Sequence, residues 1–202
     1  MKTKPFATLL LLVGLGACSS EPVVINYYAL VPPVSAADQV VQRADKPALV
    51  IERVDLAEYL QQSGMIIQSG DNQLHVSRNN MWAESLELAL PKALVRELQR
   101  QSDDYTYYLK SIDWVARTDY RLRLRIDSLQ ATDKGEVVAA GRYQLISEHG
   151  SNPHVFVDFN FHRDLDQDGY EHAVEQMQAL LAQVAEAILN SMEGLNGQEP
   201  TP

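Results

Sequence analysis

The most constraining feature of this sequence is a long amphipathic stretch near its C-terminal end. Apolar residues recur there every three or four positions, at Tyr170, Ala173, Val174, Met177, Leu180, Leu181, Val184 and Ile188. That spacing predicts a helix with a single apolar stripe, which Gly194 would end. Because such a helix must bury its stripe against another element, the rest of the chain has to supply a second layer around a common core.

A second amphipathic stretch runs from Asn80 to about Gln101. Its apolar positions recur every four residues, with Val95 beside them: Trp82, Leu86, Leu90, Leu94 and Leu98. Asn80 is a suitable N-cap residue, so we expect a second long helix to begin there. Pro91 in its middle removes one backbone hydrogen bond, and this predicts a kink or a split, of which we expect the kink.

Strand patterns fill most of the remaining chain. Between Tyr120 and Ile126, apolar residues alternate with Arg121, Arg123 and Arg125, which is the period of a strand with one buried face. Residues 26–31 and 48–56 also have the composition of strands, and residues 65–68 and 74–76 predict a hairpin with a five-residue connection. We expect residues 105–162 to form three or four antiparallel strands, with turns at 131–135 and 150–153.

These patterns together predict an α/β fold, with an α+β arrangement as the alternative. Two long amphipathic helices would pack on a mixed, largely antiparallel β-sheet in a single domain that spans residues 26–194. Residues 195–202 are expected to be a disordered tail.

The N-terminal segment has a different character from the rest of the chain. Lys2 and Lys4 are followed by an apolar run from about Phe6 to Leu15 and then by small residues, which is the layout of a secretory signal peptide. Because a helix needs about 20 apolar residues to cross a bilayer, we do not expect this short run to remain as a membrane span.

The residues after that run indicate which kind of signal it is. Leu15-Gly16-Ala17-Cys18 resembles the lipobox of bacterial lipoproteins, in which a diacylglyceryl group is attached to the cysteine sulfur before cleavage. Residues 1–17 would then be a cleaved leader, Cys18 the lipid-attachment site with N-acyl and S-diacylglycerol groups (palmitate among them), and 18–25 a short tether. The alternative is an ordinary secretory signal with a chance cysteine. Cys18 is the only cysteine, so no intramolecular disulfide can form.

Cleavage also changes the charge of the chain. Loss of Lys2 and Lys4 moves the formal net charge from −10 to −12, which disfavours nucleic acid and anionic membrane surfaces as partners. Lipid chains would therefore have to hold the domain on its membrane. Ser19 follows the cysteine where a sorting aspartate would otherwise stand, and this resembles lipoproteins exported to the outer membrane, where the domain would face the periplasm.

One acidic segment matches a calcium-binding pattern. Asp164, Asp166, Asp168 and Glu175 have the spacing of ligands in an EF-hand loop, with Gly169 at the turn. The sequence predicts a strand before this segment in place of a helix, and no second loop accompanies it. Asp168 followed by Glu171 also fits a capping box at the start of the last helix, which is the interpretation we favour.

Two other polar groups are candidate sites. The row of Arg121, Arg123 and Arg125 could bind phosphate groups or an acidic partner, but such a row is more often a solvated strand face paired with nearby acids. His154, His162 and His172, with Asp164, could ligate zinc, but they do not complete a convincing set of four ligands. We find no nucleophile elbow or phosphate-binding glycine loop, so the sequence predicts neither an enzyme nor a cofactor.

The order of several motifs resembles one known family. Besides the lipobox these are Tyr27-Tyr-x-Leu30, the 50–60 segment ending in Tyr59-Leu60, Trp82-Ala-Glu-x-Leu86, Ile112-Asp-Trp114, the turn and strand at 135–146, and Asp168-Gly-Tyr170. Together they are similar to the ABC-type transport auxiliary lipoproteins of the PqiC (YmbA) type, over nearly the whole mature chain. Pro91 departs from the helix that this resemblance would lead one to expect.

The resemblance implies a role as well as a fold. It implies an α/β lipoprotein domain without catalytic residues, located at the inner leaflet of the outer membrane. Its partners would be MCE-domain proteins and inner-membrane subunits of an intermembrane lipid transport system. Tyr59-Leu60 and Met65-Ile66-Ile67 are our candidates for contacts with a partner or a second copy of the chain, with core strand as the alternative interpretation.

We therefore expect a membrane-anchored, non-enzymatic subunit of an MCE-linked transport system that supports outer-membrane integrity. An envelope lipoprotein that scaffolds or activates other machinery is the alternative, and a calcium-binding module is a third. An adjacent MCE-domain gene would favour the first over the second.

Overall fold

The computed structural model describes residues 22–31, 45–111, 113, 117–149 and 154–196, and these form an α+β domain. The predicted combination of a mixed β-sheet and two long helices in one domain is confirmed. The elements follow one another as β1 (Asn26–Tyr28), β2 (Ala48–Leu56), the 3-10 helix η2 (Glu58–Gln61), β3 (Gly64–Ser69), β4 (Gln73–Trp82), α1 (Leu86–Gln101), β5 (Thr106–Leu109), β6 (Tyr120–Thr132), β7 (Glu136–Ser147), β8 (His154–Asp164) and α2 (Tyr170–Asn196).

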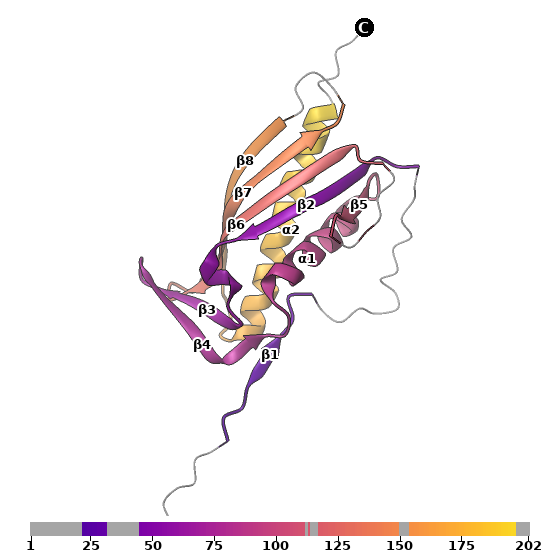
Figure 1. The fold of residues 1–202 in the computed structure, drawn as a ribbon. Helices are drawn as coiled ribbons and strands as arrows, with labels where there is room; N and C mark the ends of the chain where they lie inside the picture. Colours follow the sequence, from indigo (N-terminus) through magenta and orange to yellow (C-terminus); the bar gives the residue numbers. More distant parts are fainter. Residues whose placement is uncertain (1–21, 32–44, 112, 114–116, 150–153, 197–202) are drawn as a thin grey trace, which may run out of the picture.

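The eight strands form one sheet that branches at β6. The first part of β6 pairs with β2, and its last residues pair with β3, so that β2–β5 and β3–β4–β1 diverge from the same strand. On its other side β6 pairs with β7, and β7 pairs with β8. These two antiparallel ladders are the longest in the sheet, whereas β1–β4, β2–β5, β2–β6 and β3–β6 are parallel. The result is an elongated molecule with β1 at one end (Figure 1).

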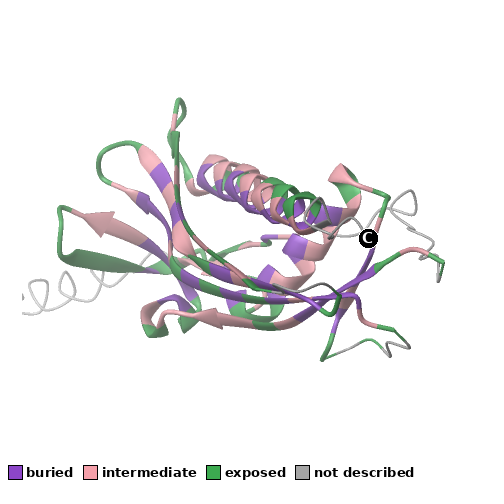
Figure 2. Cartoon of the chain, turned by 90° about the horizontal axis from the view of Figure 1, so that it is seen from above, coloured by how far each residue is buried: buried purple, intermediate pink, exposed green. Residues whose placement is uncertain are grey.

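Both helices cover the same face of this sheet and pack against each other. α2 lies along β7 and β8, and α1 lies along β2 and β5. The apolar stripe expected for α2 is buried, and Met177, Leu180 and Val184 are at most 1% exposed. Figure 2 shows that the strands and helices are divided between buried and exposed sides, as the periodicity requires.

A bulge in β6 changes which residues face the helices. Leu122, Leu124 and Ile126 are buried, and the pairing with β7 then shifts between Ile126 and Ser128, so that Leu129 becomes the next buried apolar side chain. The Tyr59 hydroxyl donates a hydrogen bond of 2.7 Å to the carbonyl of the extra residue, Asp127. The bulge therefore reverses the alternation midway along the strand, and its carbonyl is satisfied by a side chain from η2.

The bulge also requires a glycine on the neighbouring strand. Gly141 pairs with Ile126, and a Cβ atom added to Gly141 would lie 2.0 Å from the carbonyl oxygen of Arg125. Because the obstructing atom belongs to the backbone, it cannot move aside as a flexible side chain could. No side chain is compatible with the present backbone at this position.

The predicted start of α1 at Asn80 is wrong. Residues 80–82 belong to β4 and pair with β1, and the Trp82 amide donates to the carbonyl of Ser63 across the sheet. The helix begins at Leu86, and Ser85 is its N-cap residue. Trp82 is buried four residues before Leu86, so its position extends the helical spacing by coincidence. α1 continues without a break through Pro91 to Gln101. Pro91 therefore does not split the helix in two, which was the alternative to the expected kink.

The remaining elements differ from the predictions in smaller ways. The hairpin of β3 and β4 is confirmed, but its connection is shorter than five residues, since Ser69 pairs with Gln73. β5 is not part of an antiparallel series, because it pairs in parallel with β2. α2 continues past Gly194, the predicted stop, to Asn196, and residues 197–202 lie outside the described part of the chain.

Candidate functional site

The end of the molecule that carries β1 has an unusual surface. Val23, Val24, Ile25 and Tyr27 are 70, 69, 47 and 66% exposed. Among the described residues they make up half of the exposed large apolar side chains, and two more, Leu74 and Val76, lie on the adjacent strand β4. We call Val23, Val24, Ile25 and Tyr27 the N-terminal strip. Concentrated apolar exposure of this kind usually marks a contact surface.

Strand β1, which contains Tyr27 of the strip, is held firmly against the domain. β1 pairs in parallel with β4, and the Ala83 amide donates to the Tyr28 carbonyl over 2.8 Å. The Tyr28 ring lies 5.9 Å from that of Tyr170 at the start of α2, and the Gln178 side chain donates to the Leu30 carbonyl. Leu30 itself is buried in the core. Tyr27 therefore has a fixed position relative to the sheet and to α2, and Val23, Val24 and Ile25 directly precede this fixed strand.

A small apolar cavity of about 150 Å³ lies beside the Tyr28–Tyr170 ring pair. Its wall is formed by the start of α2, the end of β6 and strand β3, with Met65, Ile66, Ile67, Leu165, Tyr170 and Met177 among the lining residues. Such a volume is below the range of about 300–1,000 Å³ that is typical of small-molecule sites. The cavity gives no support to an active site.

The segments proposed from the sequence as partner contacts are mostly core. Leu60, Met65 and Ile66 are 1, 1 and 6% exposed, so they cannot form a surface contact in this conformation. Ile67 and Tyr59 are only partly buried. The core interpretation of these residues is correct, and the exposed apolar surface at this end belongs instead to the N-terminal strip.

Two of the four proposed calcium ligands, Asp166 and Glu175, lie beside a histidine. The His172 ring places Nε2 2.7 Å from an Asp166 oxygen and Nδ1 3.2 Å from a Glu175 oxygen. The Nε2 contact is short but too poorly aligned to count as a hydrogen bond, so we treat it as a close electrostatic contact. In the part of the chain that the structure describes, no three potential ligands gather around a common point, Asp164 and Asp168 included.

The same segment corrects the predicted capping box. The first backbone bond of α2 runs from the Ala173 amide to the carbonyl of Gly169, which makes Gly169 and not Asp168 the residue before the helix. Gly169 has a φ of 121°, a conformation that side-chain-bearing residues rarely adopt. With this start, the third helical residue is His172 and not Glu171.

The other histidines do not join this group. His154 opens β8, and His162 lies 3.4 Å from Glu136 on β7, while His172 contacts Asp166 and Glu175. Because these histidines have different neighbours, the structure does not bring them together as ligands of one zinc ion.

The arginine row on β6 is neutralised by acids from its surroundings. Glu52 on β2 is 10% exposed and lies 2.8 Å from Arg123 and 3.2 Å from Lys110, and Arg125 pairs with Asp127 at 2.6 Å. Burial raises the pKa of Glu52, but hydrogen bonds from Arg123 and Lys110 outweigh it, and the net pKa lies below its usual value. The paired, solvated strand face is therefore the correct interpretation of this row.

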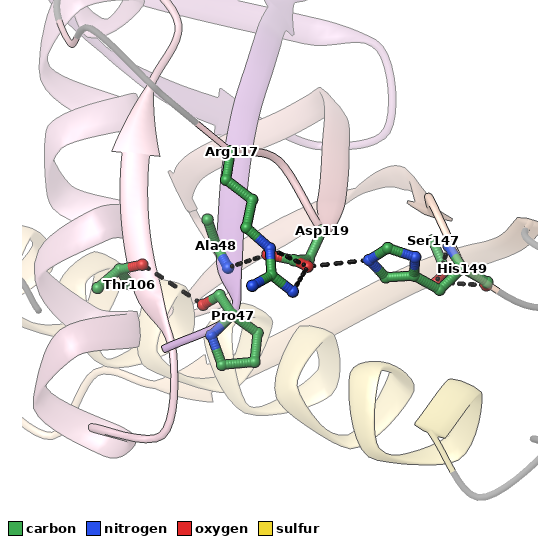
Figure 3. A network of polar contacts seen from close by, with 7 residues as sticks. All are labelled: Pro47, Ala48, Thr106, Arg117, Asp119, Ser147 and His149. Carbon is green, nitrogen blue, oxygen red and sulfur yellow. Dashed lines mark hydrogen bonds and ion pairs between the residues drawn. The ribbon is translucent and has the colours of Figure 1, made fainter. Parts of the chain in front are cut away.

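A buried carboxylate that the sequence analysis missed joins three strands at the opposite end of the sheet (Figure 3). Asp119, just before β6, is 2% exposed and accepts hydrogen bonds from the Ala48 amide, the Arg117 side chain and the His149 ring, each with a contact at 2.9 Å. Burial raises its pKa, but these bonds outweigh that effect and the net pKa is lowered. Its own amide donates to the Ala48 carbonyl, and its carbonyl accepts from Glu148.

This group contains a serine, a histidine and an aspartate, but it is not a catalytic triad. The Ser147 hydroxyl donates to the main-chain carbonyl of His149 over 2.8 Å and accepts from the His149 amide, while ring nitrogen Nε2 of His149 faces Asp119. A nucleophilic serine has to hydrogen-bond the imidazole that removes its proton. The arrangement in Figure 3 ties strand ends together and does not activate the hydroxyl.

Several residues emphasised in the sequence analysis lie outside the described residues. They include Cys18 with the leader, and Ile112 and Trp114. A search of the described helices finds none with both the length and the apolar character needed to span a bilayer.

Comparison with known proteins gives matches across almost the whole domain. The model of a family described as "ABC-type transport auxiliary lipoprotein component" matches residues 28–189. The intermembrane transport lipoprotein PqiC of Escherichia coli (strain K12) is 25% identical over 181 residues, which cover 90% of this chain and 93% of that protein. The protein of the same name from Shigella flexneri matches equally well.

Two crystal structures share the fold. An uncharacterized protein superposes with a TM-score of 0.69 at 22% identity, covering 84% of this chain and 99% of the other. A protein from Xanthomonas campestris superposes with a TM-score of 0.60 at 16% identity, covering 81% of this chain and 92% of the other. At these identities the likeness establishes the fold alone.

Proposed function

The chain belongs to the ABC-type transport auxiliary lipoprotein family, and on that premise we propose that it is a lipid-anchored, non-enzymatic subunit of an intermembrane lipid transport system. The match to an intermembrane transport lipoprotein over 90% of the chain is the observation that carries this proposal. The partners would be an MCE-domain protein and inner-membrane transport subunits, and the location the periplasmic face of the outer membrane.

The anchor in this proposal is Cys18. The sequence around it has the lipobox pattern, and only three residues lie between it and Pro22, where the described chain begins. One acyl chain gives only reversible membrane binding, but the two or three chains of a bacterial lipoprotein give a stable anchor. The domain would then work close to its membrane, with the β1 end nearest to the lipid (Figure 1).

The polar cluster around Asp119 and the apolar cavity beside Tyr170 are compatible with the proposed auxiliary role. Asp119, just before β6, and Ser147 and His149, at the end of β7, hold strand ends together, and the apolar cavity beside Tyr170 is small.

Partner capture tests the proposal directly. An affinity-tagged copy, expressed from its own locus, should be isolated from detergent-solubilised envelopes together with an MCE-domain protein. A Cys18→Ser copy is the matched control, since it cannot be acylated and should lose this association. Isolation of the wild-type protein with an unrelated assembly machine, and without transport subunits, would favour the scaffold function instead.

A genetic experiment provides an independent test. Deletion of the gene should sensitise cells to detergent when parallel lipid pathways are also missing, and the wild-type copy should restore resistance. An unchanged permeability barrier in that strain would count against a role in lipid transport.

A further inference from the structure

We propose that the N-terminal strip of Val23, Val24, Ile25 and Tyr27 lies in the interfacial layer of a phospholipid bilayer and sets the orientation of the domain on it. This inference rests on the proposed acylation of Cys18 and adds a second, non-covalent contact with the same membrane. Four observations favour a lipid surface over other occupants.

The first observation is the length of the tether. Val23 is five residues after Cys18, and an extended chain spans at most about 3.6 Å per residue, so the two are within about 18 Å of each other. The headgroup layers of a bilayer add about 10–15 Å in total to its hydrocarbon core of about 30 Å. An acylated Cys18 would therefore keep the strip within reach of the headgroup region at all times.

The second observation is that the strip is exposed directly beside a strand that is fixed to the domain. β1 is fixed by its pairing with β4, by the Tyr28–Tyr170 contact and by the hydrogen bond of Gln178 to the Leu30 carbonyl. Val23 and Val24 lie just before this fixed strand and are 70 and 69% exposed. Transfer of these side chains into the membrane interface removes apolar surface from water without any change in the fold.

The third observation is the local charge. The chain carries 27 acidic residues and a net charge of −10, yet residues 22–28 contain no charged side chain. The adjacent strand β4 contains no acid and a single arginine, Arg78. Residues 22–28 and β4 are thus free of the carboxylates that a phosphate-bearing surface would repel, and Glu21 is the acid that precedes them in the sequence.

The fourth observation is the composition of the strip. Aliphatic side chains together with an exposed tyrosine are the residues that anchor proteins at the membrane–water boundary, where the ring can lie among the headgroups. Tyr27 is 66% exposed, although the neighbouring Tyr28 is packed against α2. The geometry thus points one tyrosine outward beside three aliphatic residues.

The intact lipoprotein allows a clean test, because Cys18 is its only cysteine and its sulfur would be acylated. Val24→Cys then introduces a single free thiol into the strip. Phe156→Cys is the matched control, since Phe156 is 65% exposed against 69% for Val24. It lies on β8, an edge strand on the opposite side of the sheet from β1. Both thiols carry the same environment-sensitive fluorophore, and each protein is reconstituted into phosphatidylcholine vesicles with brominated acyl chains.

The expected result is a blue-shifted emission from the Val24 probe, with quenching by brominated lipid several-fold stronger than for the Phe156 probe. Equal quenching at the two positions would overturn the inference. A Val24 probe that is shielded from aqueous iodide but not quenched by brominated lipid would assign the strip to a protein contact, and would also overturn it.

Flotation of the vesicles separates failure of this inference from failure of the anchor. If the protein floats with the vesicles and the two probes behave alike, the strip proposal is wrong and the acyl anchor stands. If the protein does not float, the acyl anchor is absent and both proposals are wrong.

Discussion

Replacement of Asp119 by alanine should destabilise the domain far more than loss of any surface carboxylate. The Ala48 amide, at the buried start of β2, would lose its acceptor, and an unsatisfied buried amide costs about 1–3 kcal/mol. Arg117 and His149 would also lose their partner, but their side chains are 64 and 62% exposed and can be solvated. We therefore expect a loss of about 3 kcal/mol in the free energy of unfolding, most of it from the amide.

Thermal and urea denaturation of the mature chain, followed by circular dichroism, would measure this loss. For a domain of 150–250 residues, about 3 kcal/mol corresponds to a fall in Tm of about 6–12 °C. Asp158→Ala is the control, because Asp158 forms an exposed pair with Arg142, and its removal should leave Tm nearly unchanged. Ordinary surface substitutions change the free energy of unfolding by less than about 0.5 kcal/mol. A loss in that range for Asp119→Ala would refute the assignment of Asp119 as the carboxylate that joins the three strands.

The pH dependence supplies a second check on the same residue. The pKa of folded Asp119 is lowered from its ordinary value of 3.8, so its ionised form contributes stability that is fully present above pH 3.8. That contribution is lost as the pH falls through the lowered pKa. The difference in stability between wild type and Asp119→Ala should therefore shrink below pH 3.8, and a constant difference would contradict the role of the charge.

Further substitutions test other parts of the fold. Gly141→Ala should cost about 1–3 kcal/mol in urea denaturation, since its Cβ would meet the Arg125 carbonyl. Gly194→Ala should instead stabilise α2, by up to about 1 kcal/mol, because the added Cβ meets nothing within 4 Å. Equal effects of the two would refute the backbone clash. Burial raises the pKa of Tyr107 to about 12, so its contribution to stability is present below pH 10 and is lost as the pH rises toward 12. Tyr107→Phe should flatten this fall in an alkaline denaturation series, and an unchanged slope would contradict the assignment.

The elements with strong local patterns were predictable from the sequence. β2 has the predicted bounds, Ala48–Leu56, because a run of β-branched residues is a local signal. α2 was predicted because its stripe continues for five turns without interruption. The family resemblance, drawn from the order of short motifs, is confirmed by the match over residues 28–189.

Features that depend on contacts between distant segments were not predictable in this way. Trp82 fits the helical spacing of α1, but its amide bonds to Ser63 in the sheet, and only strand pairing reveals this. The parallel pairing of β5 with β2 joins segments more than 50 residues apart and leaves no local pattern. Asp119 precedes a strand like many exposed aspartates, and its burial depends on Ala48, which is 71 residues away.

The most direct test of the central claim is the mass of the N-terminal peptide of the protein purified from membranes. Our account predicts a mature chain that begins at Cys18, with the mass increment of a diacylglyceryl group on sulfur and an acyl chain on nitrogen. A companion Cys18→Ser protein should retain residues 1–17 and accumulate at its precursor mass. An N-terminal peptide that begins elsewhere, or an unmodified Cys18 in the mature protein, would contradict the account.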